Sequence, residues 1–106
     1  MNFAFYGQAI ITDREQASTI RARQLADATT RTEAHGGRIV RIFFDIYPDR
    51  FRAWPYRRNA TKLLTAVEDR QRGFAAIIIS DTRTAFPFYH HFDDVQHWCL
   101  HHDVQL

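Results

Sequence analysis

Three short, largely apolar segments alternate with two segments of helical periodicity along this chain of 106 residues. The apolar segments, residues 2–11, 38–44 and 75–80, are rich in aromatic and β-branched side chains, which is typical of buried strands. Residues 15–34 and 56–72 place apolar side chains three and four positions apart, and glycines follow both segments. Each is therefore predicted to be a helix. Strands that alternate with helices favour a parallel sheet covered by those helices.

The rest of the chain extends the same pattern. Residues 88–101 have helical spacing, and residues 103–106 look like the start of another strand. We therefore predict an α/β fold, a single open three-layer domain with a mostly parallel four-stranded sheet. In such sheets the functional residues gather after the carboxyl ends of the strands. Here these ends fall at residues 8–13, 45–55 and 80–87.

Composition excludes several classes of protein. No apolar run approaches the roughly 18 residues that a membrane-spanning helix needs. The N-terminus lacks the basic and apolar regions of a signal peptide. Cys99 is the single cysteine, so no internal disulfide can form. We expect a cytoplasmic protein with no membrane partner.

Basic residues concentrate in the middle of the chain. Residues 50–72 contain seven basic side chains and two acidic ones, whereas the whole chain has a formal charge of only +2. Arginine presents a planar fork of donors that suits phosphate groups. The segment therefore either contacts nucleic acid or forms a solvated helix face and loop.

Several short motifs occur together in a particular order. Tyr6 opens the sequence Tyr-Gly-Gln-Ala-Ile, and Arg23-Gln24-Leu25 lies in the first predicted helix. Phe43-Phe44-Asp45, Arg57-Arg58 and Asp81 follow at the ends of later elements. In order and spacing this set resembles the N-terminal catalytic domain of the serine recombinases, the resolvase/invertase family. The resemblance runs from Phe3 to about Leu106 and implies a resolvase-like fold.

The resemblance also implies a damaged active site. The family places Tyr, Arg and Ser at alternate positions of the first strand, and its serine attacks DNA. Tyr6 matches the tyrosine, but Gln8 replaces the arginine and Ile10 replaces the serine. Isoleucine has no oxygen lone pair with which to attack phosphorus. Thr12 is the nearest hydroxyl, and it is either a substitute nucleophile or, more simply, a helix N-cap.

Other family positions are partly retained. Gln24 matches a glutamine that faces the active site, or it is an ordinary exposed helix residue. Arg58, with Arg57 beside it, matches the arginine that opens the second helix. Asp81 matches the aspartate after the third strand, whereas the two arginines that follow it in the family are absent. Arg83 lies one step from one of them, so Arg57, Arg58 and Arg83 are the candidate DNA contacts.

These positions predict a recombinase-type catalytic domain over residues 1–106 that is partial and catalytically inactive. The long C-terminal helix and the DNA-binding domain of the family are not in this sequence, which we interpret as truncation. The resemblance implies DNA as the partner and DNA strand exchange as the ancestral reaction. The alternative is a non-catalytic module that pairs with itself or with an intact recombinase, motivated by a strand edge at Leu106 and by apolar Phe86 and Phe88.

Other constellations are weaker. His97 and His101 are four apart on a predicted helix, as in some zinc sites, but Cys99 faces away from them. Asp45 and Asp81 follow strands, yet the paired acids of a phosphoacceptor domain are missing after the first strand. The aromatic residues between Phe43 and Tyr56 fit core and loop packing better than base stacking. We expect no metal site and no cofactor.

Overall fold

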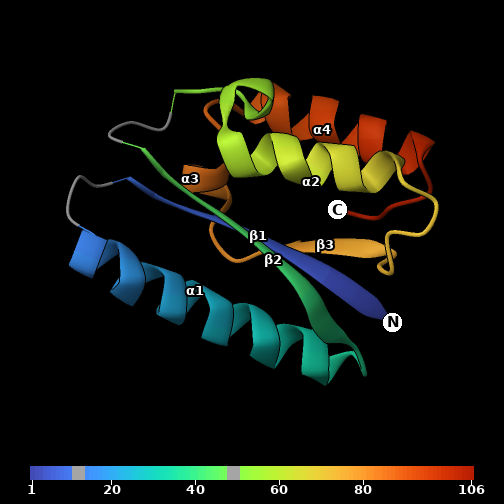
Figure 1. Cartoon of the computed structure of the whole chain (residues 1–106), viewed down its shortest axis with the longest axis horizontal. Helices are drawn as coiled ribbons and strands as arrows, with labels where there is room; N and C mark the ends of the chain where they lie inside the picture. Colours follow the sequence, from blue (N-terminus) through green and yellow to red (C-terminus); the bar gives the residue numbers. More distant parts are fainter. Residues whose placement is uncertain (11–13, 48–50) are drawn as a thin grey trace.

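A parallel sheet in the order β2-β1-β3 lies between one long helix and two others (Figure 1). Its strands are β1 (Asn2–Ile10), β2 (Arg38–Tyr47) and β3 (Ala76–Ile79). These coordinates are a computed structural model that describes residues 1–10, 14–47 and 51–106. The predicted roles of Thr12, as nucleophile or N-cap, lie outside the described residues.

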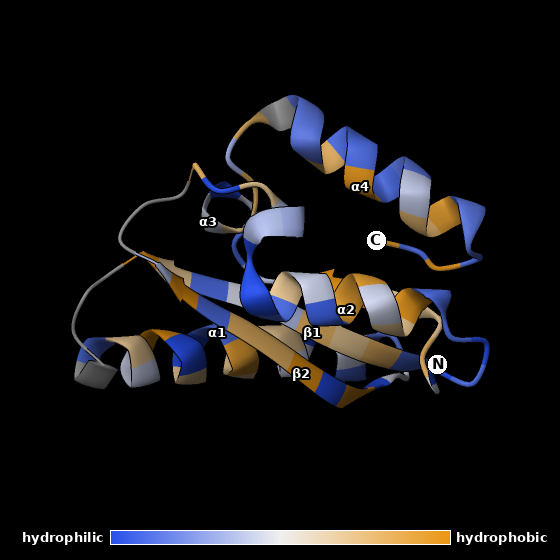
Figure 2. Cartoon of the chain, turned by 45° about the horizontal axis from the view of Figure 1, so that its top comes forward, coloured by the Kyte–Doolittle hydropathy of each residue, from blue (hydrophilic) through white to orange (hydrophobic). Residues whose placement is uncertain are grey.

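Helices cover both faces of the sheet. Helix α1 (Arg14–Ala34) lies on one face, and α2 (Arg58–Glu68) and α4 (Tyr89–His101) lie on the other (Figure 1). The short helices η1 (Trp54–Tyr56) and α3 (Thr82–Ala85) precede α2 and α4. Figure 2 shows that the strands are largely hydrophobic and that the helices around them combine hydrophilic and hydrophobic residues. No helix in the described part of the chain is long and apolar enough to cross a membrane.

Two glycines end α1 and return the chain to the sheet. Gly36 has φ of +73°, and the Gly37 amide donates to the Thr32 carbonyl at 2.8 Å, as in a Schellman motif. A Cβ on Gly37 would overlap the Phe3 ring and lie 2.7 Å from the Met1 carbonyl oxygen. The second glycine is therefore required because β1 passes close to this turn.

The buried face of α1 carries mostly small side chains. Ala17, Ala28 and Thr32 are buried there together with Gln24. Small residues at this spacing let the helix axis approach β1 closely. This proximity fixes the position of Gln24 against the strand.

The main hydrophobic core lies between the sheet and the α2–α4 layer. Trp54 is its largest member and stacks on Phe86 at a centroid distance of 5.0 Å and an angle of 7°. Tyr6 packs against the other side of the indole at 4.5 Å, and the Trp54 Nε1–H donates to the Ala85 carbonyl at 2.7 Å. These contacts hold η1 and α3 together above the carboxyl ends of the strands.

The prediction of a four-stranded sheet is wrong in its strand number. Among the described residues the sheet has three strands, and residues 103–106 contribute one parallel bridge, between Ala76 and Gln105. Asp103, with φ of +62°, directs the chain from α4 toward β3, and the Val104 amide donates to the Cys99 carbonyl.

Other predicted boundaries also differ. The second helix was expected at 56–72, but α2 is shorter because Pro55 lies in η1 and Arg57 is extended. Strand β2 continues to Tyr47, three residues beyond its expected end. The expected loop at 80–87 contains α3, which Asp81 caps by accepting a hydrogen bond from the Arg83 amide.

Candidate functional site

Strand β1 carries three matched positions of the predicted active site on one face. Tyr6, Gln8 and Ile10 alternate along the strand, and in register they stand opposite Phe43, Asp45 and Tyr47 of β2. Tyr6 and Gln8 have no exposed surface, and Ile10 is half-buried at the end of the strand. The row therefore ends in a hydrocarbon side chain.

Tyr6 belongs to a buried polar cluster, not to an open site. Its hydroxyl donates to Asp45 Oδ2 at 2.8 Å and accepts a hydrogen bond from Arg57 Nη1 at 3.3 Å. Burial is the main cause that raises the pKa of Tyr6 far above its usual value, and the Asp45 charge adds to the effect. The phenol remains protonated and acts as a hydrogen-bond donor.

Asp45 connects this cluster to α2. Its Oδ1 accepts from the Asn59 amide at 2.8 Å, and its Oδ2 accepts from the Ala60 amide at 2.9 Å. A carboxylate at a helix N-terminus accepts hydrogen bonds from amides that have no partner within the helix, and its negative charge interacts favourably with the helix dipole. The side chain of Arg57, the N-cap residue, makes no capping hydrogen bond to α2. Asp45 of β2 caps the helix instead. Asp45 and Asp81 cap different helices and do not form a shared carboxylate pocket in this structure.

The two adjacent arginines have opposite environments. Arg57 is fully buried, and its guanidinium donates to the backbone carbonyls of Arg52, Thr84 and Ala85. These contacts join the chain around η1 to α3. Arg58 is exposed, and its amide donates to the Tyr47 hydroxyl at 2.7 Å.

Gln24 is buried at the α1–β1 contact, so it is not an exposed helix residue. Its Nε2 donates to the Gln8 carbonyl at 3.1 Å, and no described residue donates to its Oε1. A Cβ on Gly7 would overlap this Oε1 atom and lie 2.8 Å from Phe5 Cζ. Glycine at position 7 therefore makes room for the glutamine.

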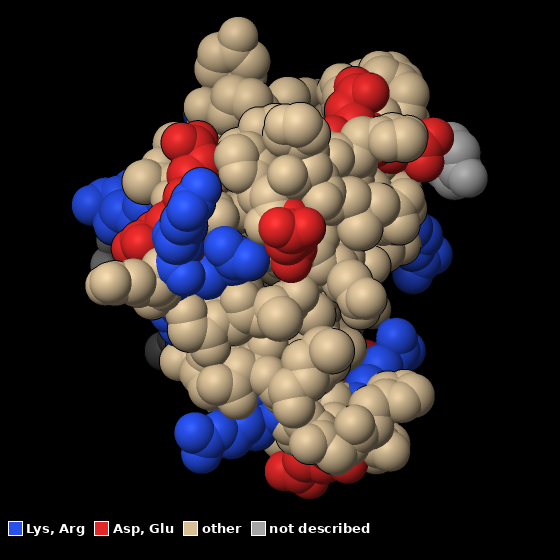
Figure 3. Space-filling model, turned by 90° about the vertical axis from the view of Figure 1, so that its right-hand side faces the viewer, with Lys and Arg blue, Asp and Glu red and all other residues tan. Residues whose placement is uncertain are grey.

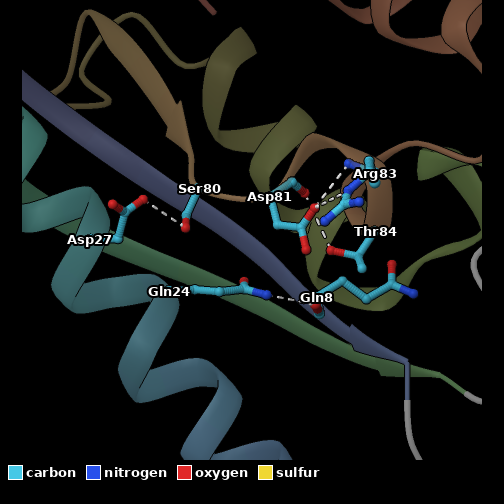
Figure 4. A network of polar contacts seen from close by, with 7 residues as sticks. All are labelled: Gln8, Gln24, Asp27, Ser80, Asp81, Arg83 and Thr84. Atoms are coloured by element: carbon cyan, nitrogen blue, oxygen red, sulfur yellow. Dashed lines mark hydrogen bonds and ion pairs between the residues drawn. The ribbon is translucent and has the colours of Figure 1, made fainter.

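A polar pocket opens beside Gln24, after the carboxyl end of β3 (Figure 4). Its volume is about 540 Å³, and it is lined by Arg23, Gln24, Asp27, Ser80, Asp81, Thr82 and Arg83. The Ser80 hydroxyl donates to Asp27 Oδ2 at 3.0 Å, and Asp27 pairs with Arg31 at 3.3 Å. The structure thus brings together Gln24, Asp81 and Arg83 of the predicted set, and it adds Arg23, Asp27 and Ser80.

Sequence reasoning missed Asp27 and Ser80 because no family motif includes them. Arg23 was quoted only as part of a motif, although it borders the pocket. The available signal was spacing, since Arg23 and Asp27 stand four apart on α1 and share one helix face. Arg83, with 88% of its side chain exposed, lies 3.8 Å from Asp81, so its guanidinium extends into solvent at the pocket rim.

The histidines of α4 do not gather around a ligand site. Cys99 is fully buried in the core, whereas His97 and His101 are exposed. Burial raises the pKa of the Cys99 thiol to about 11. Within the described ranges, no three His, Cys, Asp or Glu residues lie close enough to hold a metal ion.

No protein-family model matches this chain, and no curated protein matches its sequence. Among solved structures, it is similar to the C-terminal catalytic domain of ISC1926 TnpA, an IS607-like serine recombinase. The TM-score is 0.78 at 20% sequence identity, and the match covers 99% of this chain and 67% of that one. That catalytic domain is C-terminal in its protein, so the comparison gives no support to the narrower prediction of an N-terminal resolvase/invertase domain. It does establish the fold: this chain has the fold of a serine-recombinase catalytic domain.

Proposed function

We propose that this chain is a serine-recombinase-like domain that contacts DNA but does not cleave it. The observation that carries the proposal is Ile10 at the end of β1, where the resemblance requires the nucleophilic serine. Gln8 replaces the arginine that would bind the scissile phosphate, and it is fully buried. Without an attacking oxygen on β1, a phosphoserine link to DNA cannot form there.

The hydroxyl of the polar pocket does not replace the missing serine. Ser80 follows β3 and already donates to Asp27, whose carboxylate pairs with Arg31. Activation of a serine needs a base that is available to accept its proton. The pocket therefore supports binding of a polar group more than it supports nucleophilic attack.

The proposed DNA contacts are Arg58 and Arg83. Both are exposed near the carboxyl ends of the strands, where α2 and α3 begin. Arg57 supports them indirectly, because it fixes η1 against α3. The opposite end of the molecule shows small groups of mixed charge on a largely uncharged face (Figure 3).

The test is duplex binding by fluorescence anisotropy as a function of salt. Arg58→Ala and Arg83→Ala should each weaken binding roughly threefold to tenfold at low salt and lower the salt slope by about one. Arg70→Ala is the matched control, since Arg70 is exposed and follows the far end of α2. Equal losses in all three variants would mean that binding is non-specific attraction and not a contact at this end of the domain.

Exposed apolar residues on β2 favour a second candidate function, a non-catalytic interaction module. Ile42 and Ile46 remain 44% and 45% exposed on this edge strand, and an apolar strand edge is a template for pairing. Of the two phenylalanines that suggested this module from the sequence, Phe86 is buried and Phe88 is exposed. Sedimentation equilibrium, alone and with a full-length recombinase, distinguishes the two: association that Ile42→Lys abolishes would favour the module.

A further inference from the structure

Four rings from two distant segments form a cluster, which we call the aromatic patch: the exposed Phe51, Phe88 and His90, and the half-buried His91. The Phe51 and Phe88 centroids are 6.1 Å apart. His90 stacks on Phe88 at 5.8 Å with an angle of 3°, and His91 meets the same ring edge-on at 5.6 Å. The patch thus joins the segment before η1 to the start of α4.

The patch is not an extension of the core. Phe51 and Phe88 are 60% and 52% exposed, whereas Trp54 and Phe86 fill the interior close by in the chain. Burying a phenylalanine side chain stabilises a protein by roughly 1.5–3 kcal/mol. Two phenylalanines that stay largely exposed do not contribute most of this stabilisation. Exposed aromatic clusters of this kind mark binding surfaces.

An apolar groove continues from the patch. It has a volume of about 320 Å³ and is lined by Ala53, Trp54, Pro55, Leu64, His91, Asp94, Val95 and Trp98, of which Asp94 is acidic. His91 belongs both to this groove and to the patch. A planar apolar group therefore finds ring faces outside the groove and an aromatic wall within it.

Basic residues follow Phe51 in the chain, whereas Asp93 and Asp94 follow the patch residues on α4. From Phe51 to Val67 the sequence contains basic residues and no acidic one. The Arg52 guanidinium lies 4.4 Å from the centre of the Tyr47 ring, and the Tyr47 hydroxyl accepts from the Arg58 amide. Tyr47 therefore contacts the guanidinium of the exposed Arg52 and the backbone of the exposed Arg58. Phe88 is the N-cap of α4, whose first turn has no acidic side chain.

We propose that the aromatic patch binds unpaired bases of single-stranded DNA, an inference that rests on the proposed function as a DNA-contacting domain. Planar rings beside arginines bind single strands by stacking on base faces and pairing with phosphates. A duplex keeps its base faces stacked on one another, so only unpaired bases can use the patch.

The test compares a short labelled oligothymidylate with a duplex of the same length. Phe51→Ala and Phe88→Ala should each weaken oligothymidylate binding roughly fivefold to a hundredfold and leave duplex binding unchanged. Phe88→Trp should retain binding because it keeps a ring face, whereas Phe88→Leu should lose it despite its apolar bulk. Leu100→Ala is the control, since Leu100 is 51% exposed near the other end of α4. Thermal denaturation establishes that every variant is folded.

The outcomes separate this inference from the proposed function. Duplex binding that depends on Arg58 and Arg83, without oligothymidylate binding by the patch, would overturn the inference alone. Binding to neither DNA at low salt would overturn both. If Phe88→Leu binds as well as the parent protein, stacking is wrong. If the alanine variants alter only self-association, the patch is an interface between copies and the inference is wrong.

Discussion

Tyr6 donates a hydrogen bond of 2.8 Å to Asp45, although 39 residues separate them in the chain. The same carboxylate accepts from the first amides of α2, so one side chain ties β1, β2 and this helix together. Tyr6 thus has a structural role that does not depend on the residue at position 10.

Replacing Asp45 with asparagine should destabilise the domain by about 2–4 kcal/mol, because it removes a buried carboxylate that accepts three hydrogen bonds. The free energy of unfolding in urea measures the effect. Glu68→Gln, on the exposed last turn of α2, should change it by less than about 0.5 kcal/mol. A similar small change for both variants would contradict the structural role of Asp45.

Gly7→Ala should destabilise the domain by roughly 1–3 kcal/mol, since the added methyl group overlaps Gln24 Oε1. Gln24→Ala removes that obstacle, so the double variant should lose less than the sum of the single losses. Gly36→Ala is a useful comparison: its Cβ meets nothing within 4 Å, and its cost comes from φ of +73° alone. Additive losses for Gly7 and Gln24 would show that the two residues do not interact.

Stability should fall as the pH rises from about 9 toward 11. Burial raises the pKa of the Cys99 thiol to about 11 in the folded protein, from its ordinary value of 9.0. Between these two pH values the thiol is deprotonated in the unfolded chain but still protonated in the folded one, which favours unfolding. One such group contributes a slope of at most about 1.4 kcal/mol per pH unit. The raised pKa of Tyr6 acts in the same direction at higher pH. Unfolding free energies at pH 8 and pH 10 should differ, and Cys99→Ala should reduce the difference; an unchanged slope in that variant would assign the effect to other groups.

Introducing the arginine and serine that the recombinase motif has at positions 8 and 10 should lower the stability of the domain. Gln8 has no exposed surface, so Gln8→Arg introduces a charge into a buried position and should cost about 3–5 kcal/mol. Ile10→Ser lies at the half-buried strand end and should fold with a smaller loss. Urea unfolding of both variants checks the order; an arginine tolerated at position 8 would indicate that the surroundings of β1 still accommodate the motif.

The helices and strands of this fold were predicted from the sequence better than the contacts between them. Apolar periodicity located β1, β3 and α1, because burial on one or both faces leaves a regular pattern. It missed the partnership of Tyr6 and Asp45, since a bond between neighbouring strands leaves no local signal. The short fourth strand was expected from residues 103–106, where an aspartate at positive φ leads only to a single bridge.

The candidate site was predicted only in part, and burial explains the difference. Motif matching placed Arg57 and Arg58 together as DNA contacts, but the structure buries one guanidinium and exposes its neighbour. Adjacent residues at a helix start point in different directions, which the order of letters does not reveal. The aromatic patch was missed for a similar reason, since Phe51 and Phe88 meet only in the folded chain.

Covalent attachment to DNA tests the central claim most directly. The protein is incubated with nicked suicide duplexes of varied sequence, and a serine recombinase on its own site is the positive control. Denaturing electrophoresis then separates any protein–DNA adduct, and mass spectrometry identifies the attached residue. We predict that the control forms an adduct and that this chain forms none. An adduct mapped to any hydroxyl side chain of this chain, Ser80 included, would contradict the account.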